Sequence, residues 1–247
     1  MAATGVSRNA GGSTQVARGV VLRTIRHTEG RLIARICTDR FGTRGVLVRA
    51  GRGGVTPAAL QPLSRVELVV VAPEGRDLLL ARELRVERPY VNLALDPLRG
   101  TLALFTQELL VHVLREEVED PELFATLQEM LEELDAGTDP AGFPLRAMVA
   151  LLPHLGIVPV TTAGDPAGFD LREGLFFAGR APHELCMSAE RARVFNALLG
   201  GAVHDLGTTV PGAVRRALLG DLLTYFRLHV EAFGELRSPE VLHAVLA

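Results

Sequence analysis

The chain of 247 residues contains no lysine, and all 26 of its basic residues are arginine. A P-loop lysine and Schiff-base chemistry are therefore excluded. The two cysteines, Cys37 and Cys186, are too few for a disulfide framework or a four-cysteine zinc site, and their number fits a reducing cytosol. No apolar run approaches the ~20 residues of a membrane span, and the N-terminus lacks the apolar stretch of a secretory signal. We therefore expect a globular, cytoplasmic protein.

Charge is distributed unevenly along the chain. Residues 1–90 hold 15 arginines and 7 acids, a net charge of +8, whereas residues 91–247 hold 11 arginines and 22 acids, a net charge of −11. The first 52 residues hold 10 of the arginines against only Glu29 and Asp39. Arginine binds phosphate with two parallel hydrogen bonds. The excess of arginine therefore predicts that residues 1–90, the basic part, bind a nucleic acid. A solvated basic face without a ligand is the alternative.

Alternating apolar and polar residues indicate five β-strands in the basic part. The predicted strands cover residues 17–27, 31–37, 44–50, 65–72 and 78–87, and glycine and proline mark the turns between them. Residues 1–16 are small, polar and rich in glycine, and we expect them to form a mobile tail. Five short strands without a helix predict a five-stranded oligonucleotide-binding (OB) barrel over residues 17–90.

From Pro97 onward the apolar residues follow the helical period. Helices are predicted near residues 97–113, 120–137, 142–155 and 188–199, on a longer segment with an apolar stripe over 218–230, and from Ser238 to the C-terminus. Residues 156–187, rich in glycine and proline, are expected to form an irregular insert. The predicted fold class is therefore α+β, an OB-fold β-barrel followed by an all-α domain over residues 91–247.

The arginines of the basic part are the candidate phosphate contacts. Period-two alternation places Arg31 and Arg35 on one face of their strand. The other candidates precede this strand or lie in the adjoining turns and loop, and they are Arg23, Arg26, Arg40, Arg44, Arg49 and Arg52. Only Phe41 and Tyr90 are aromatic in the first 90 residues, so counterion release rather than base stacking should supply most of the affinity.

No catalytic constellation is apparent in the sequence. The loop Gly51-Arg52-Gly53-Gly54 lacks the Lys-Ser/Thr of a P-loop and is interpreted as a flexible basic loop. His183 and Cys186 could be two metal ligands, but no second pair lies nearby, so we interpret them as a polar turn and a buried thiol. Acidic pairs such as Glu132-Glu133 are interpreted as the solvated face of a helix. We expect no enzyme activity, no metal and no cofactor, although an unrecognised enzyme site stays as an alternative.

Three stretches carry a family resemblance through their order and spacing. They are Gly19–Thr24 followed by Leu32–Gly42, then Leu60–Leu68, which begins Leu-Gln-Pro, and the C-terminal run Leu222–Ala247. Together with the order of predicted elements, they resemble the RecO family of bacterial recombination mediators. The resemblance implies a protein that binds single- and double-stranded DNA, anneals complementary strands and helps to load recombinase. It also implies a nucleoid-associated location, and RecR and the acidic tail of single-strand-binding protein as partners, the tail on the helical domain.

One departure from the family pattern concerns the insert. Many RecO proteins carry paired cysteines there that form a zinc finger, whereas residues 156–187 contain only Cys186. The resemblance therefore implies a zinc-free variant whose insert is held by apolar packing, with these candidates: Phe169, Leu171, Leu175, Phe176 and Phe177.

Arg215 and Arg216 could extend the DNA path or form surface ion pairs. The main alternative is a basic OB-fold scaffold that binds RNA or protein and does not anneal strands.

Overall fold

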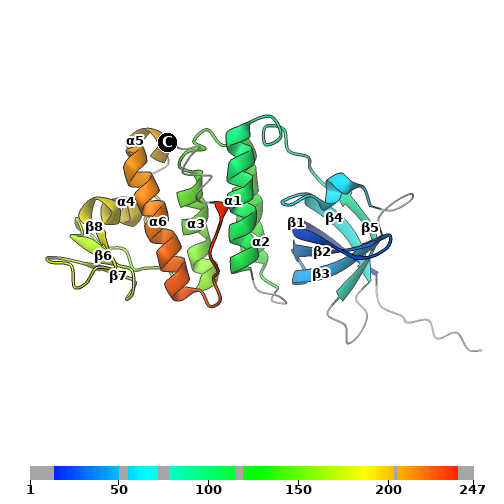
Figure 1. Ribbon diagram of the computed structural model, residues 1–247, viewed down its shortest axis with the longest axis horizontal. Helices are drawn as coiled ribbons and strands as arrows, with labels where there is room; N and C mark the ends of the chain where they lie inside the picture. Colours follow the sequence, from blue (N-terminus) through cyan, green and yellow to red (C-terminus); the bar gives the residue numbers. More distant parts are fainter. Residues whose placement is uncertain (1–13, 50–54, 72–77, 115–118, 203–204, 239–247) are drawn as a thin grey trace, which may run out of the picture. The chain divides into compact units, whose positions relative to one another are not determined.

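The computed structural model describes residues 14–49, 55–71, 78–114, 119–202 and 205–238 (Figure 1). The chain forms two compact units, one made of Met1–Pro89 with Leu114–Pro121 and one made of Tyr90–Val113 with Glu122–Ala247. The return of Leu114–Pro121 to the first unit was not predicted. Arg35 Nη2 donates a hydrogen bond of 2.7 Å to the carbonyl oxygen of Leu114, which joins this segment to the barrel.

The first unit is a closed barrel of five strands in the order β1-β2-β3-β5-β4, so the predicted OB barrel is confirmed. The strands are β1 (Thr14–Thr28), β2 (Arg31–Thr38), β3 (Gly42–Arg49), β4 (Arg65–Val71) and β5 (Leu78–Val86), with a short 3₁₀ helix η1 at Pro57–Leu60. β1 pairs antiparallel with both β2 and β4, and the parallel pairing of β3 with β5 completes the barrel. The period-two pattern explains the core, because the inward residues of each strand are almost fully buried.

The start of β1 differs from the prediction. Thr14, Gln15 and Val16 were assigned to a tail, but they lie opposite Val71, Val70 and Val69 of β4. The prediction extended the tail too far, because small, glycine-rich residues precede Thr14. Threonine and valine are themselves common in strands, and pairing with β4 places them in β1.

The second unit is mainly helical, as predicted. Its helices are α1 (Pro97–Val113), α2 (Pro121–Ala136), α3 (Phe143–Leu155), α4 (Ala189–Leu199), α5 (Leu206–Thr209) and α6 (Gly212–His229). α1 begins where the sequence indicates, because Asp96 Oδ1 accepts the Leu98 amide at 2.9 Å and Pro97 occupies the first turn. Beyond Ser238, the predicted last helix lies outside the described residues. Among the described helices, none is long and apolar enough to cross a membrane.

The insert contains a three-stranded sheet in the order β7-β6-β8, where the sequence predicted only irregular structure. Its strands are β6 (Gly168–Asp170), β7 (Leu175–Phe177) and β8 (Cys186–Ser188), each too short to show a period-two pattern. Phe169 is fully buried, with ring centroids 4.8 Å from Phe176 and 5.1 Å from Phe195. Leu171 is also buried, but Leu175 is 57% exposed and was wrongly assigned to the packing.

Gly168 offers a test of how tightly this sheet is packed. A Cβ atom added at Gly168 would lie 2.3 Å from Phe177 Cζ and 2.7 Å from the Met187 carbonyl oxygen. We expect Gly168→Ala to lower the free energy of unfolding by about 2 kcal/mol, measured by urea denaturation with circular dichroism. Gly100→Ala is the control, because a Cβ there meets nothing within 4 Å and should stabilise α1. Equal stability of the two variants would contradict the packing.

Candidate nucleic-acid interface

Strand register brings four of the eight predicted arginines together on the outer face of the barrel. Arg31 of β2 lies opposite Arg49 of β3, and Arg35 of β2 lies opposite Arg23 of β1. Directly opposed residues project on the same side of a sheet, and like charges in such pairs destabilise it. An anion bound between the two arginines of a pair would relieve this repulsion. The two pairs lie roughly 13 Å apart along β2.

A groove opens beside the Arg31–Arg49 pair. The pairing of β3 with β5 ends at Leu47 and Leu80. A cavity of about 630 Å³ is lined by the residues that follow on both strands, and four arginines border it: Arg31, Arg49, Arg82 and Arg85. Of the described residues that line this groove, Glu83 is the one acid. The groove therefore presents positive charge above an apolar floor that includes Leu47 and Leu80.

Arg82 and Arg85 were not among the predicted site residues. Arg85 is tied to the carboxylate of Glu67, with a distance of 3.1 Å from Nε to Oε1, whereas Arg82 is exposed and forms no ion pair with another described residue. A usable signal existed, because both arginines lie in the predicted strand 78–87. In the strand order of an OB barrel this strand is a neighbour of the strand that ends at Arg49.

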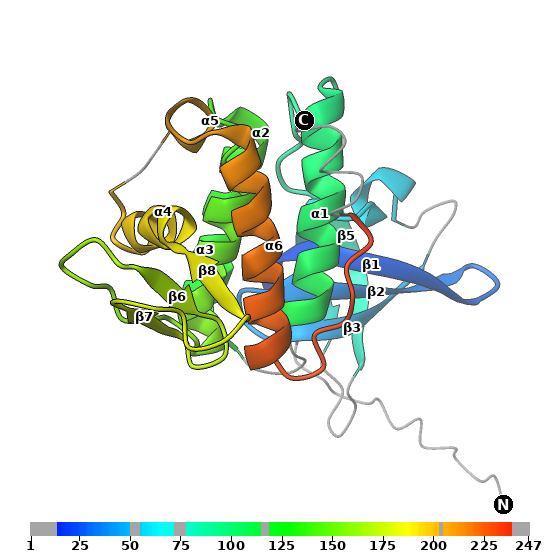
Figure 2. The ribbon, with the colours of Figure 1, turned by 60° about the vertical axis from the view of Figure 1, so that its left-hand side comes forward.

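The remaining predicted arginines are not part of this group. Arg26 is exposed in the β1–β2 hairpin, which projects from the barrel in Figure 2. It lies opposite Leu32 and so projects on the other side of the sheet from Arg31. Arg40 lies in the β2–β3 turn, at the other end of β2, and Arg44 lies in β3 opposite Ile36. They donate to the carbonyl oxygens of Val16 (3.3 Å) and Phe41 (3.2 Å) respectively. The length of β2 places this turn roughly 23 Å from Arg31.

Arg35 and Arg52 differ from the other predicted arginines. Arg35 is half-buried, and its Nη2 is hydrogen-bonded to the Leu114 carbonyl oxygen at 2.7 Å, so part of its guanidinium holds the barrel to the Leu114–Pro121 segment. Arg52 lies outside the described residues. The exposed and grouped members of the predicted set are therefore Arg23, Arg31 and Arg49.

Neither cysteine forms an evident reactive centre. Burial raises the pKa of Cys37 to about 11, so this thiol is protonated at neutral pH. Cys186 is half-buried, not buried as expected, and its Sγ lies 3.6 Å from His183 Nδ1. His183 Nε2 lies 3.0 Å from Asp170 Oδ2, and the three donor groups are within 4.8 Å of one another.

This cluster joins the end of β6 to the start of β8. Asp170 lies opposite Cys186, and its Oδ1 accepts the backbone amides of Arg172 and Glu173. Burial would raise the pKa of Asp170, but these amides and His183 outweigh burial and hold it below its usual value. The three side chains are fewer ligands than the four of a structural zinc site, and their mutual hydrogen bonds fasten the insert.

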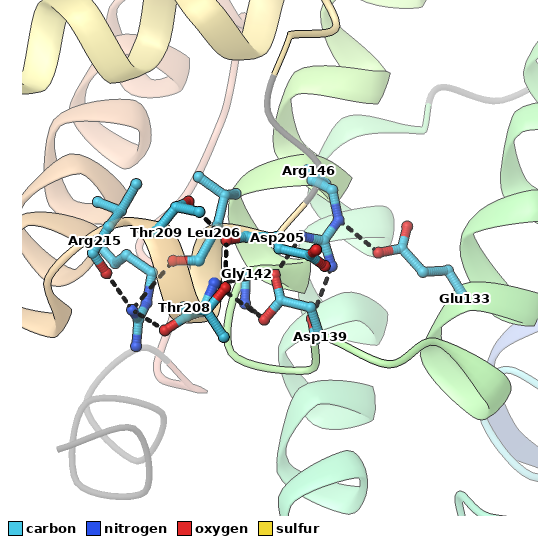
Figure 3. A network of polar contacts seen from close by, with 11 residues as sticks. Glu133, Asp139, Gly142, Arg146, Asp205, Leu206, Thr208, Thr209 and Arg215 are labelled. Atoms are coloured by element: carbon cyan, nitrogen blue, oxygen red, sulfur yellow. Dashed lines mark hydrogen bonds and ion pairs between the residues drawn. The ribbon is translucent and has the colours of Figure 1, made fainter.

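Arg215 contacts the backbone of the helical unit. Its Nη1 donates to the carbonyl oxygens of Leu206 (3.3 Å) and Gly207 (3.0 Å) in α5 and of Val210, which follows this helix (Figure 3). This contact differs from the surface ion pair that we considered, and it stabilises the start of α6. A DNA contact of Arg216 stays a prediction.

The strand order and the basic groove define an OB-fold protein whose barrel is joined to a helical unit. Two family models match the chain, the N-terminal region of recombination protein O over residues 14–90 and its C-terminal region over residues 94–239. The chain belongs to the RecO family.

Individual relatives match along almost their whole length. The DNA repair protein RecO of Flavobacterium psychrophilum is 26% identical over 235 residues, which cover 93% of this chain and 98% of that protein. The protein of the same name from Phocaeicola vulgatus is 28% identical over 230 residues, covering 91% and 95%. That of an Exiguobacterium species is 26% identical over 234 residues, covering 90% and 92%.

Proposed function

We propose that this chain is a DNA-binding mediator of recombinational repair that anneals complementary strands and assists the loading of recombinase. Membership of the RecO family and relatives named DNA repair protein RecO support the role in repair. The observation that carries DNA binding is the grouping of Arg31, Arg49 and Arg82 at one groove of an OB barrel. The β2–β3 face is where OB folds bind oligonucleotides.

The mechanism is neutralisation of phosphates, and no bond is made or broken. Each arginine that binds a phosphate releases condensed counterions, which gives affinity without sequence preference. None of the described residues that line the groove is aromatic, so the affinity per base is lower than in barrels that stack bases on aromatic rings. Weak contacts to individual bases suit an annealing protein, because it must hold two strands and then release the duplex.

The proposal includes partners and a location. Single- and double-stranded DNA would bind the basic barrel, while RecR and the acidic tail of single-strand-binding protein would be the protein partners, the tail on the helical unit. The protein would act in the cytoplasm at the nucleoid, without a metal or cofactor.

An annealing assay across salt concentrations tests this function. We expect the purified protein to speed the pairing of complementary oligonucleotides, and the logarithm of its affinity for single-stranded DNA to fall linearly with the logarithm of salt concentration. The slope should correspond to about three phosphate contacts, one each for Arg31, Arg49 and Arg82 at the groove. A basic scaffold for RNA or protein would bind without speeding annealing. A flat salt profile with no annealing would remove the proposal.

A further inference from the structure

The outer face of the barrel carries aliphatic side chains between its arginines. Register places Ile25 of β1 opposite Ile33 of β2, Ile33 opposite Leu47 of β3, and Leu47 opposite Leu80 of β5. These four residues, here called the aliphatic row, therefore cross four neighbouring strands on one side of the sheet. The row is separate from the barrel core, which is made of the alternate residues of the same strands.

The aliphatic row is partly open to solvent. Ile25 is 52% exposed and Leu80 is 36% exposed, and Ile33 and Leu47 are half-buried. An uninterrupted apolar row on a charged surface marks a binding site more often than scattered exposed residues do.

Arginines border the aliphatic row on both sides. Two positions along the strands from Ile33, roughly 7 Å away, lie Arg31 with Arg49 on one side and Arg35 with Arg23 on the other. The Arg35 side is partly occupied, because Arg35 donates to the Leu114 carbonyl oxygen. The Arg31–Arg49 side borders the groove and is the open one. A ligand on this face would therefore meet positive charge beside an apolar strip.

We propose that the aliphatic row binds the unstacked bases of single-stranded DNA while Arg31 and Arg49 bind the phosphates beside them. This inference rests on the proposed function and adds a preference for single strands to it. An apolar protein partner would need few cations, and a duplex hides the faces of its bases, so charge and apolar surface together fit an exposed single strand. Aliphatic side chains contact any base without reading its identity.

The dimensions agree with this ligand. Four strands at a spacing of ~4.8 Å give a row about 14 Å long. Stacked bases at ~3.4 Å would number about four along this length, and unstacked bases lie farther apart, so the row contacts fewer than four bases. The row therefore contacts only part of the ~4–16 nucleotides that one OB fold binds.

The experiment compares base contacts with backbone contacts. Wild type and Ile25→Ser with Leu80→Ser are titrated with a labelled oligothymidine, an abasic oligonucleotide of equal length and a matched duplex. We expect wild type to bind the oligothymidine about tenfold more tightly than the abasic strand, and the double variant to lose about fivefold on the oligothymidine alone. The salt slope should stay unchanged, because no phosphate contact is lost.

Val16→Ser is the matched control, because Val16 is also 52% exposed on β1 but lies opposite β4, away from the row. It should bind like wild type, and all variants should keep the wild-type unfolding temperature.

Ile33→Phe should raise affinity for the oligothymidine but not for the duplex, because an aromatic ring stacks on bases.

Two outcomes would overturn the inference while leaving DNA binding intact. One is wild type that binds the abasic strand as tightly as the oligothymidine. The other is a double variant that keeps the wild-type ratio between these two probes. Failure of the proposed function has a different signature, since wild type would then bind neither probe in a salt-dependent way.

Discussion

Replacing Arg31 and Arg49 together by glutamine should lower the affinity for single-stranded DNA by about 25-fold at about 0.1 M salt. Both side chains lie on the outer face of paired strands and border the same groove. For single strands each lost phosphate contact reduces the salt slope by ~0.7, so the double variant should reduce it by about 1.4. The affinities of wild type and variant should therefore converge near 1 M salt, which fluorescence anisotropy across a salt series would measure.

Arg40→Gln is the control for this result, because it removes one positive charge from the same barrel, half of what the double variant removes. Arg40 lies at the β2–β3 turn, where its Nη1 donates to the Val16 carbonyl oxygen at 3.3 Å. The turn is farther from the groove than the Debye length of ~10 Å at 0.1 M salt, so its charge is screened from DNA bound there. If Arg40→Gln weakened binding by about fivefold at 0.1 M salt, as the loss of one phosphate contact would, the whole barrel surface and not the groove would be the interface.

The sequence predicted the barrel well because its signal is local. Alternation of apolar and polar residues in stretches such as residues 31–37 needs no knowledge of the rest of the chain, and β2 occupies Arg31–Thr38. Register is not local. That Arg31 faces Arg49 depends on the length and geometry of the β2–β3 turn, and the parallel contact of β3 with β5 depends on how the barrel closes.

Long-range hydrogen bonds account for most of what the sequence did not predict. The contact of Arg35 with the Leu114 carbonyl oxygen spans 79 positions. It occupies part of a guanidinium that the sequence predicted to contact phosphate. Asp135 is another example, since this buried carboxylate accepts the backbone amides of Val91, Asn92 and Leu93 more than 40 positions away. An acid at the end of an amphipathic helix is usually solvated, so its sequence carries no sign of this role.

Replacing Arg146 by methionine should destabilise the helical unit by about 3 kcal/mol or more. Arg146 joins Glu133 of α2 to Asp139, with distances of 2.6 Å from Nε to Glu133 Oε1 and 2.7 Å from Nη1 to Asp139 Oδ2 (Figure 3). The side chains of Arg146 and Asp139 are only 18% and 11% exposed. Methionine keeps much of the stem volume but leaves the Asp139 carboxylate without its cation, and a mostly buried unpaired charge is costly. Urea denaturation followed by circular dichroism would measure the loss.

The pH dependence distinguishes the lost ion pair from lost packing. Burial would raise the pKa of Asp139, but hydrogen bonds from Arg146, Gly207 and Gly142 outweigh burial and hold it below its usual value. A carboxyl whose folded pKa is depressed stabilises the fold above its unfolded pKa of ~3.9 and loses this contribution as pH falls through the folded pKa. Without Arg146 the depression shrinks, so wild type should lose more stability than Arg146→Met between neutral pH and about pH 3.

The matched control for this variant is Arg193→Met, which breaks an exposed pair in the same unit. Arg193 and Asp165 are 3.7 Å apart, with side chains 50% and 83% exposed. Such a pair contributes at most about 1 kcal/mol, so its loss should change neither the stability at neutral pH nor the acid profile by much. Equal destabilisation by the two variants, or an acid profile of Arg146→Met that parallels that of wild type, would mean that packing of the arginine stem and not its charge holds α2 and α3 together.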